Sequence, residues 1–247
     1  MISTSATIGE LVVERAERAM LFERLGLDYC CGGDRTLAAA CAERELDPEV
    51  VVATVEAFDA ATAAASAKPE PHDLSEATLS EICDHIETAH HDWLRRELPQ
   101  IAELLDSVIR VHAPVHPELH ELVPLFGGLR DELESHLDDE ERVLFPAARA
   151  VEHGDAAVAL DEATLGTYEH EHEHVGELLA SLRELTHDFD ADAALCRTHR
   201  RLVEGLHALE LDLHRHIHEE NNILLPRLRA AARAGSGEGG IRTLGTR

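Results

Sequence analysis

The sequence predicts an all-α protein, an up-and-down four-helix bundle preceded by a small helical domain. Four long segments between residues 75 and 233 repeat their apolar residues at spacings of three and four, the period of a helix that is buried on one face. Aromatic residues make up only 3% of the chain, and no segment alternates apolar and polar residues as a strand would. Turn signals at residues 114–117, 153–155 and 187–192 separate the four segments, which favours a bundle.

Residues 1–58 are predicted to form the small helical domain, because their short apolar stretches are interrupted by Asp-Tyr-Cys-Cys-Gly-Gly at residues 28–33. The glycine pair of this loop allows positive φ, and Thr36 is placed to cap the helix that follows. Residues 59–74 are alanine-rich, contain two prolines and are predicted to be a linker, although their alanines could extend the preceding helix. The glycine-rich residues 234–247 are predicted to be a disordered tail.

The strongly acidic composition excludes some classes of binding partner. The 247 residues carry 22 Lys and Arg against 49 Asp and Glu, a net charge of −27, and Lys68 is the only lysine. A basic surface that could bind phosphate groups is therefore not expected, which argues against nucleic acid and anionic lipid as partners. No apolar run approaches the roughly 20 residues that span a bilayer, and the first residues lack the pattern of a secretory signal. We therefore expect a cytoplasmic protein.

Three of the four predicted bundle helices carry polar residues on their apolar stripe, the row of positions at spacings of three and four where leucine is expected. In the last helix the stripe runs through Leu209 and Leu213 to His216, Glu220 and Ile223. The second helix likewise places His136 and Glu140 on its stripe, and the third places His172 there. The two His-x-x-x-Glu pairs lie 80 residues apart, and each is followed by three apolar residues and a proline at identical offsets. The bundle therefore consists of two similar helical hairpins.

Several imidazoles and carboxylates converging in a core would cost several kcal/mol each without compensation, so the pattern predicts a metal site. Imidazole together with carboxylate suits iron, manganese or zinc, and two bridging carboxylates suit two ions about 3.5–4 Å apart. In the first helix His85, His90 and His91 compete for the remaining position, and periodicity slightly favours His90. His214 and His218 lie off the stripe and are predicted to be solvated.

The five cysteines are an odd number, and Cys30 and Cys31 are adjacent, which is not the pattern of a secreted disulfide framework. In a glycine-flanked loop this pair can present thiolates for transient iron, nitrosyl or disulfide chemistry, which makes both residues candidate catalytic thiols. Alternatively, the two side chains simply pack as small apolar groups. The sequence leaves both interpretations open.

These motifs resemble a known family, the iron-sulfur cluster repair di-iron proteins, also called the repair of iron centres family. The resemblance extends from Ile8 to about Leu228, and its most specific parts are residues 28–33, 135–141, 171–179 and 216–222. It implies a hemerythrin-like bundle with a non-haem centre of two iron ions, bridged by an oxygen atom and by both glutamates. The iron ligands that it implies are His91, His136, Glu140, His172, His216 and Glu220. In the first helix the resemblance thus selects His91.

The resemblance also implies a part in repairing iron-sulfur clusters that oxidative or nitrosative stress has damaged, with iron donation as one route. Damaged iron-sulfur enzymes would then be clients, and nitric oxide, oxygen and peroxide would be small ligands. Three alternatives stay open: a di-iron nitric oxide or peroxide reductase, a hemerythrin-like carrier or sensor of oxygen or nitric oxide, and an acidic metal buffer. The sequence also leaves the oligomeric state open, a homodimer included.

Overall fold

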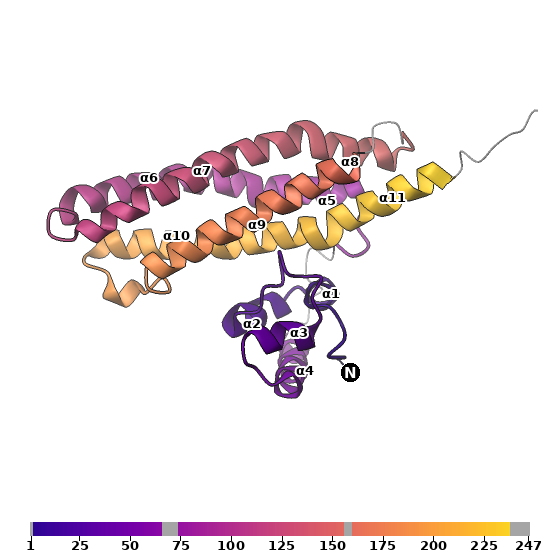
Figure 1. The fold of residues 1–247 in the computed structure, drawn as a ribbon, viewed down its shortest axis with the longest axis horizontal. Coiled ribbons are helices and arrows are strands. Elements are labelled where there is room, and N and C mark those ends of the chain that lie inside the picture. The colour runs from indigo at the N-terminus through magenta and orange to yellow at the C-terminus, as the bar shows by residue number, and fades with distance from the viewer. Residues whose placement is uncertain (1, 66–73, 156–159, 238–247) are drawn as a thin grey trace, which may run out of the picture.

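The computed structural model describes residues 2–65, 74–155 and 160–237, and shows a small helical unit beside a long helical bundle (Figure 1). No described residue lies in a strand, and a single antiparallel bridge pairs Thr7 with Thr36. The small unit consists of α1 (Ile8–Glu14), α2 (Arg18–Leu25), α3 (Leu37–Glu43) and α4 (Pro48–Ala65). The all-α prediction is confirmed.

Local sequence signals explain the starts of the short helices. Thr7 and Glu10 form a capping box at α1, in which each side chain bonds the backbone N–H of the other residue. Thr36 caps α3 as predicted, because its hydroxyl accepts a hydrogen bond from the backbone N–H of Ala39. A separate apolar cluster, which includes Ile8, Phe22 and Leu37, fills the centre of this unit.

Four rods that run alternately up and down form the bundle (Figure 1). The first rod is α5 (Leu79–Ile86) with α6 (Asp92–His112), and the second is α7 (Leu122–Asp139) with α8 (Phe145–Glu152). The third is α9 (Glu162–Leu185), and the fourth is α10 (Arg197–Glu219) with α11 (Leu225–Gly237). Short 3₁₀ turns, η2 (Pro117–Glu121) and η5 (Ala191–Ala193), lie in two of the connections.

Three of the rods contain a π-helical turn of five residues, and the sequence analysis did not predict these turns. They are η1 (Glu87–His91), η3 (Glu140–Leu144) and η6 (Glu220–Leu224). Pro146 and Pro226 follow η3 and η6 at the same offset. A proline inside an α-helix lacks the N–H for the ladder, and its ring clashes with the carbonyl four residues earlier, so a wider turn relieves the conflict. The repeated proline was the sequence signal for two of these turns, η3 and η6, and no proline stands at that offset after η1.

Two apolar clusters fill the bundle on either side of a buried polar layer. One contains residues such as Leu98, Leu129 and Leu206, and the other contains residues such as Ile82 and Phe145. On every rod a candidate metal ligand lies between the residues of the first cluster and those of the second, namely His91, Glu140, His172 and Glu220, and His136 and His216 lie at the adjoining edge of the first cluster. Packing on both sides thus fixes the height of the polar layer.

The small unit contacts the fourth rod through its cysteine loop. Nδ1 of His218 lies 3.1 Å from the backbone oxygen of Tyr29, and the Asn222 amide donates to the backbone oxygen of Cys30 at 3.1 Å. His218 is buried and His214 is half-buried, so the prediction that both are solvated was wrong. The docked unit covers the face of α10 that a free bundle would expose.

The loop glycines serve a different purpose from the one predicted. Gly32 and Gly33 are not among the residues with positive φ. Instead, a Cβ added to Gly33 would lie 2.2 Å from Oδ1 of Asn222, so a side chain at this position would collide with the bundle. The loop therefore needs glycine for close approach.

Two segment boundaries also differ from the prediction. Helix α4 continues to Ala65, so the first part of the predicted linker 59–74 is helical, because alanine is the strongest helix former. Helix α11 continues to Gly237, four residues into the predicted tail 234–247, as an extension of the alanine-rich turns before it. Residues 66–73 and 238–247 lie outside the described residues. No described helix has the length and apolar character needed to cross a membrane.

Candidate metal centre

Six buried side chains converge in the polar layer of the bundle, and they come from all four rods. His91 ends η1, His136 lies in the last turn of α7, and His172 lies in the middle of α9. His216 lies in the last turn of α10, and Glu140 and Glu220 begin η3 and η6. All six side chains are at least 93% buried, and both glutamates are fully buried. The sequence-predicted ligand set is thus brought together in one place.

The six residues form two overlapping groups that share both glutamates. One group is His91, Glu140, His216 and Glu220; the other is His136, Glu140, His172 and Glu220. Within each group, one ligand atom from every residue lies within 4.8 Å of the others. We call the first group the His91 half and the second the His136 half.

Each carboxylate directs one oxygen toward each half. Oε1 of Glu140 lies 2.9 Å from Nε2 of His136, and Oε2 of Glu140 lies 3.3 Å from Nε2 of His91. Oε2 of Glu220 lies 3.1 Å from Nε2 of His172, and its Oε1 lies 3.3 Å from Nε2 of His216. Two carboxylates arranged in this way can bridge two cations, one in each half.

The glutamate oxygens have no hydrogen-bond donor in the described structure. All four carboxylate oxygens of Glu140 and Glu220 are buried and lack a hydrogen-bond partner. An unsatisfied buried acceptor costs about 1–3 kcal/mol, and more when it is charged. The imidazole nitrogens also face one another, at 3.0 Å between His136 and His172 and 3.3 Å between His91 and His216. A cation in each half would satisfy all of these atoms, so the residues fit a dinuclear metal centre.

Polar residues behind the histidines hold three of the four imidazoles in position. Nδ1 of His91 donates to Oε1 of Glu141 at 2.8 Å, and Nδ1 of His136 donates to Oε2 of Glu171 at 2.7 Å. Oδ1 of Asn221 accepts from Nδ1 of His172 at 2.8 Å. Such bonds fix the tautomer that leaves Nε2 free to bind a metal. Nδ1 of the fourth imidazole, His216, is buried without a partner.

The supporting residues Glu141, Glu171 and Asn221 were not predicted as site residues. Each stands next to a ligand in the sequence, inside the motifs that carry the family resemblance. Their position beside a ligand was the available signal, but periodicity places them off the apolar stripe and says nothing about which histidine they contact.

The electrostatics of the two halves differ. Burial opposes the charged imidazole at His136 and at His172, but the facing carboxylates outweigh it and raise their pKa values to about 11 and about 9. The carboxylates also outweigh burial at His91 and raise its pKa, whereas at His216 burial prevails and the pKa is lowered. The imidazoles around Glu140 hold the pKa of its carboxyl well below the usual range, although burial alone would raise it. Glu140 is therefore an anion that can bind a cation.

The competition among the first-helix histidines has a clear geometric outcome. His91 lies in the centre, whereas His90, which periodicity slightly favoured, points to a neighbouring cluster with His85 and Glu219. Because η1 is a π turn, extrapolating an α-helical period through it misplaces the residues at its end. The widened turn explains why periodicity favoured the wrong neighbour for this centre.

The cysteine pair lies against the bundle near the His136 half. Sγ of Cys31 lies 3.5 Å from the backbone oxygen of His172. Cys30 is buried and Cys31 is half-buried, so only Cys31 is accessible. A hydrogen bond between the two thiols, together with burial, raises the pKa of Cys30, while the same bond lowers the pKa of Cys31.

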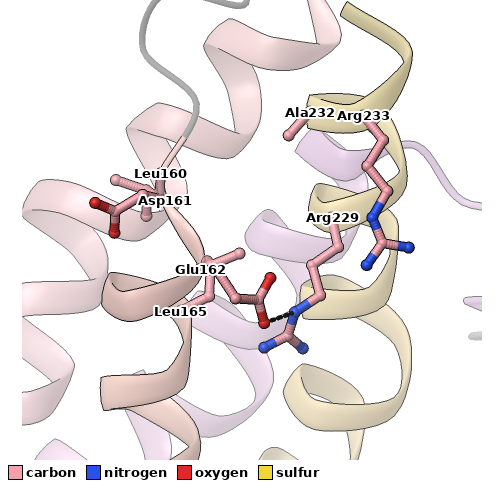
Figure 2. Close-up of a pocket in the computed structure, with 7 residues that line it drawn as sticks. All are labelled: Leu160, Asp161, Glu162, Leu165, Arg229, Ala232 and Arg233. Carbon is pink, nitrogen blue, oxygen red and sulfur yellow. Dashed lines mark hydrogen bonds and ion pairs between the residues drawn. The ribbon is translucent and has the colours of Figure 1, made fainter. Parts of the chain in front are cut away.

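A surface pocket between α9 and α11 lies apart from this centre. Figure 2 shows Arg229 directed toward Glu162, to which its Nε donates at 2.9 Å. The same guanidinium donates two hydrogen bonds to Glu169. None of the predicted site residues lines this pocket, and the Arg229 guanidinium is already paired. We therefore assign the candidate chemistry to the buried centre.

A four-helix bundle that buries two such groups of imidazoles and carboxylates defines a hemerythrin-like cation-binding protein. Residues 84–228 match the hemerythrin HHE cation-binding domain, and residues 4–59 match ScdA_N, a domain of unknown function (DUF542). Relatives named iron-sulfur cluster repair protein YtfE, from Escherichia coli O17:K52:H18 (strain UMN026 / ExPEC) and from Shigella boydii serotype 4 (strain Sb227), are 35% identical over 220 residues. The match covers 89% of this chain and 94% of each relative.

The chain therefore belongs to the family of hemerythrin-domain proteins that includes these iron-sulfur cluster repair proteins. The family resemblance and the hemerythrin-like fold inferred from the sequence are both confirmed.

Proposed function

We propose that the polar layer holds two iron ions. The His91 half would bind one ion through His91 and His216, and the His136 half would bind the other through His136 and His172. Glu140 and Glu220 would bridge them. The observation that carries this proposal is that the two oxygens of each buried carboxylate face different pairs of imidazoles.

We further propose that the protein takes part in the repair of iron-sulfur clusters damaged by oxidative or nitrosative stress, with damaged iron-sulfur enzymes as clients. Support comes from the similarity to iron-sulfur cluster repair proteins over nearly the whole of both chains. When bound, the two ions would supply electrons, open coordination positions for nitric oxide, oxygen or peroxide, and iron for donation. We propose that the protein has this role in the cytoplasm.

The residues of the chain control access and charge in this scheme. The apolar clusters above and below the layer exclude water, which strengthens the attraction between the carboxylates and a cation. The imidazoles must be neutral to bind, so His136 and His172, whose pKa values are raised, have to release their protons when metal ions bind. Cys31, half-buried beside the backbone of His172, is placed to contact a small ligand or an ion that leaves the His136 half.

A repair assay tests the function. A purified iron-sulfur enzyme is inactivated with nitric oxide and then incubated with iron-loaded protein, and its recovered activity is measured. We expect recovery with the wild type and with Glu177→Ala, whose side chain is 79% exposed, and little recovery with Glu140→Ala. Equal recovery with Glu140→Ala, or with free ferrous iron at the same concentration, would contradict the proposal.

A further inference from the structure

A second group of metal-ligating side chains lies beside the dinuclear centre, and the proposed function does not use it. His85 of α5, His90 of η1 and Glu219 of α10 bring one ligand atom each within 4.8 Å of the others. Nε2 of His85 lies 3.3 Å from Oε2 of Glu219, and Nε2 of His90 lies 3.4 Å from the same oxygen. The two imidazoles are five residues apart, a spacing that a π turn places on one face.

These distances suit a shared cation better than hydrogen bonds. A charge-assisted hydrogen bond between imidazole and carboxylate is about 2.7–2.9 Å long. Bonds of about 2.1 Å to a tetrahedral metal instead place neighbouring ligand atoms about 3.3–3.4 Å apart. The observed separations match the second geometry.

Two of the three ligand atoms, those of His90 and Glu219, are buried without hydrogen bonds. His90 is 95% buried, yet its Nε2 has no hydrogen-bond partner in the described structure, and neither has Oε2 of Glu219. The two atoms lie 3.4 Å apart, within the group that His85 completes. Buried polar atoms are nearly always bonded, so two unbonded atoms that face each other indicate a missing ligand.

The residue behind His90 matches the pattern of the dinuclear centre. Nδ1 of His90 donates to Oδ1 of Asp212 at 3.0 Å, as Nδ1 of His91 does to Glu141 and Nδ1 of His136 does to Glu171. A carboxylate on Nδ1 sets the tautomer whose Nε2 can bind a metal. His90 is thus oriented for metal binding in the same way as the ligands of the main centre.

We propose that His85, His90 and Glu219 form a third, mononuclear site for a divalent transition-metal ion. Two imidazoles and one carboxylate are a ligand set for Zn²⁺, Fe²⁺ or Mn²⁺. The side chains of His85 and Glu219 are 14% and 18% exposed, so the ion is reachable from solvent and water can complete its coordination.

The third site is distinct from the dinuclear centre although the two are adjacent. The ring of His90 stacks on the ring of His216 with centroids 5.3 Å apart and planes 7° apart. The consecutive residues His90 and His91 thus serve different sites. An ion in the third site would lie one imidazole layer from the His91 half.

Counting bound ions tests the proposal. The metal-free protein is dialysed to equilibrium against Co²⁺, and bound ions per chain are measured together with the visible absorption of the metal. We expect Glu219→Gln and His85→Asn each to bind one ion fewer than the wild type and to lose part of the absorption. The matched control is His170→Gln on α9, whose side chain is 82% exposed, and it should bind as many ions as the wild type.

Two controls accompany the measurement, one for folding and one for the dinuclear centre. Circular dichroism shows whether each variant folds, and His85→Asn carries the test if Glu219→Gln does not. Folded variants that both bind as many ions as the wild type would overturn the third site. The dinuclear centre is tested separately by Glu140→Ala, which should lose the ions of the polar layer and keep the ion bound by Glu219.

Discussion

The two halves of the metal centre have the same ligand types but different support. In the His136 half both imidazoles are held through Nδ1, by Glu171 and Asn221. In the His91 half only His91 is held, and Nδ1 of His216 has no partner. We infer that the His136 half binds its ion more tightly.

The internal repeat shows where this difference arises. Glu171 precedes His172 in the sequence, and the residue that precedes the equivalent His91 is His90. Glu171 bonds His136 across the bundle, whereas His90 stacks on His216 and bonds Asp212 instead. One change between the repeats therefore removes a support from the His91 half and supplies a ligand to the third site.

The largest effect is expected where the halves share a ligand. Glu140→Ala removes a carboxylate from both halves at once, so after anaerobic loading the polar layer should hold nearly none of its two iron ions. Glu177→Ala, an exposed carboxylate on α9, should keep two ions. Retention of two ions by Glu140→Ala would show that the halves do not depend on a bridge.

A smaller effect is expected from a residue that supports one half. Glu171→Ala should weaken binding of one ion about 10–100-fold, the usual effect of losing a carboxylate behind a metal-bound histidine, and leave the other ion unchanged. Binding isotherms resolve the two steps. Glu173→Ala, 67% exposed on the same helix, is the matched control. Equal weakening of both steps would mean that the halves are not independent in the way we infer.

The pH dependence of the metal-free protein should separate His136 from His216. The pKa values of His136 and His172 are raised to about 11 and about 9, above the ordinary 6.5 of an unfolded chain. Their protonated forms therefore stabilise the fold fully below about pH 6.5, and this contribution disappears as the pH rises through 9 toward 11.

Urea unfolding of the metal-free protein should accordingly give a lower free energy of unfolding at pH 9.5 than at pH 6.5. His136→Ala should reduce this alkaline loss, whereas His216→Ala should keep it, because the pKa of His216 is lowered. An alkaline loss of the same size in His136→Ala would contradict the assignment. Metal affinity should move in the opposite direction and fall as the pH drops, since only neutral imidazoles bind.

The smallest effect concerns the aromatic neighbours. Phe145 lies beside His91 with ring centroids 5.4 Å apart, and Tyr168 lies beside His136 at 6.0 Å. The Tyr168 hydroxyl donates to Oδ2 of Asp139 at 2.8 Å, a bond that the other half lacks. Tyr168→Phe makes the halves alike, and should lower the free energy of unfolding by about 1 kcal/mol without changing iron content. A loss of iron in this variant would mean that the hydroxyl supports the centre.

Much of the fold follows from the sequence because helical periodicity is a local property. The stripe through Leu209, Leu213 and His216 predicts a helix with one buried face, and the structure shows that helix. Periodicity predicts which residues face the core only where the helix keeps the α-helical period. It failed at η1, where the π turn shifts His91 into the centre and His90 out of it.

The supporting contacts of the site depend on tertiary packing, so the periodicity of a single helix does not predict them. Asn221 follows Glu220 in the sequence, yet it bonds His172 on another rod, and no local pattern states that partner. The burial of His218 depends on a separate unit docking through the cysteine loop. Such contacts depend on how elements are placed in space, which a stripe along one helix does not encode.

The central claim is that two iron ions lie between the halves and that each buried glutamate bridges them. Crystallography of the iron-loaded protein with anomalous data collected at the iron edge tests it directly. The account predicts two strong anomalous peaks in the polar layer, about 3.5–4 Å apart, one bonded to His91 and His216 and the other to His136 and His172. A single peak in that layer, or two peaks without a glutamate between them, would contradict it.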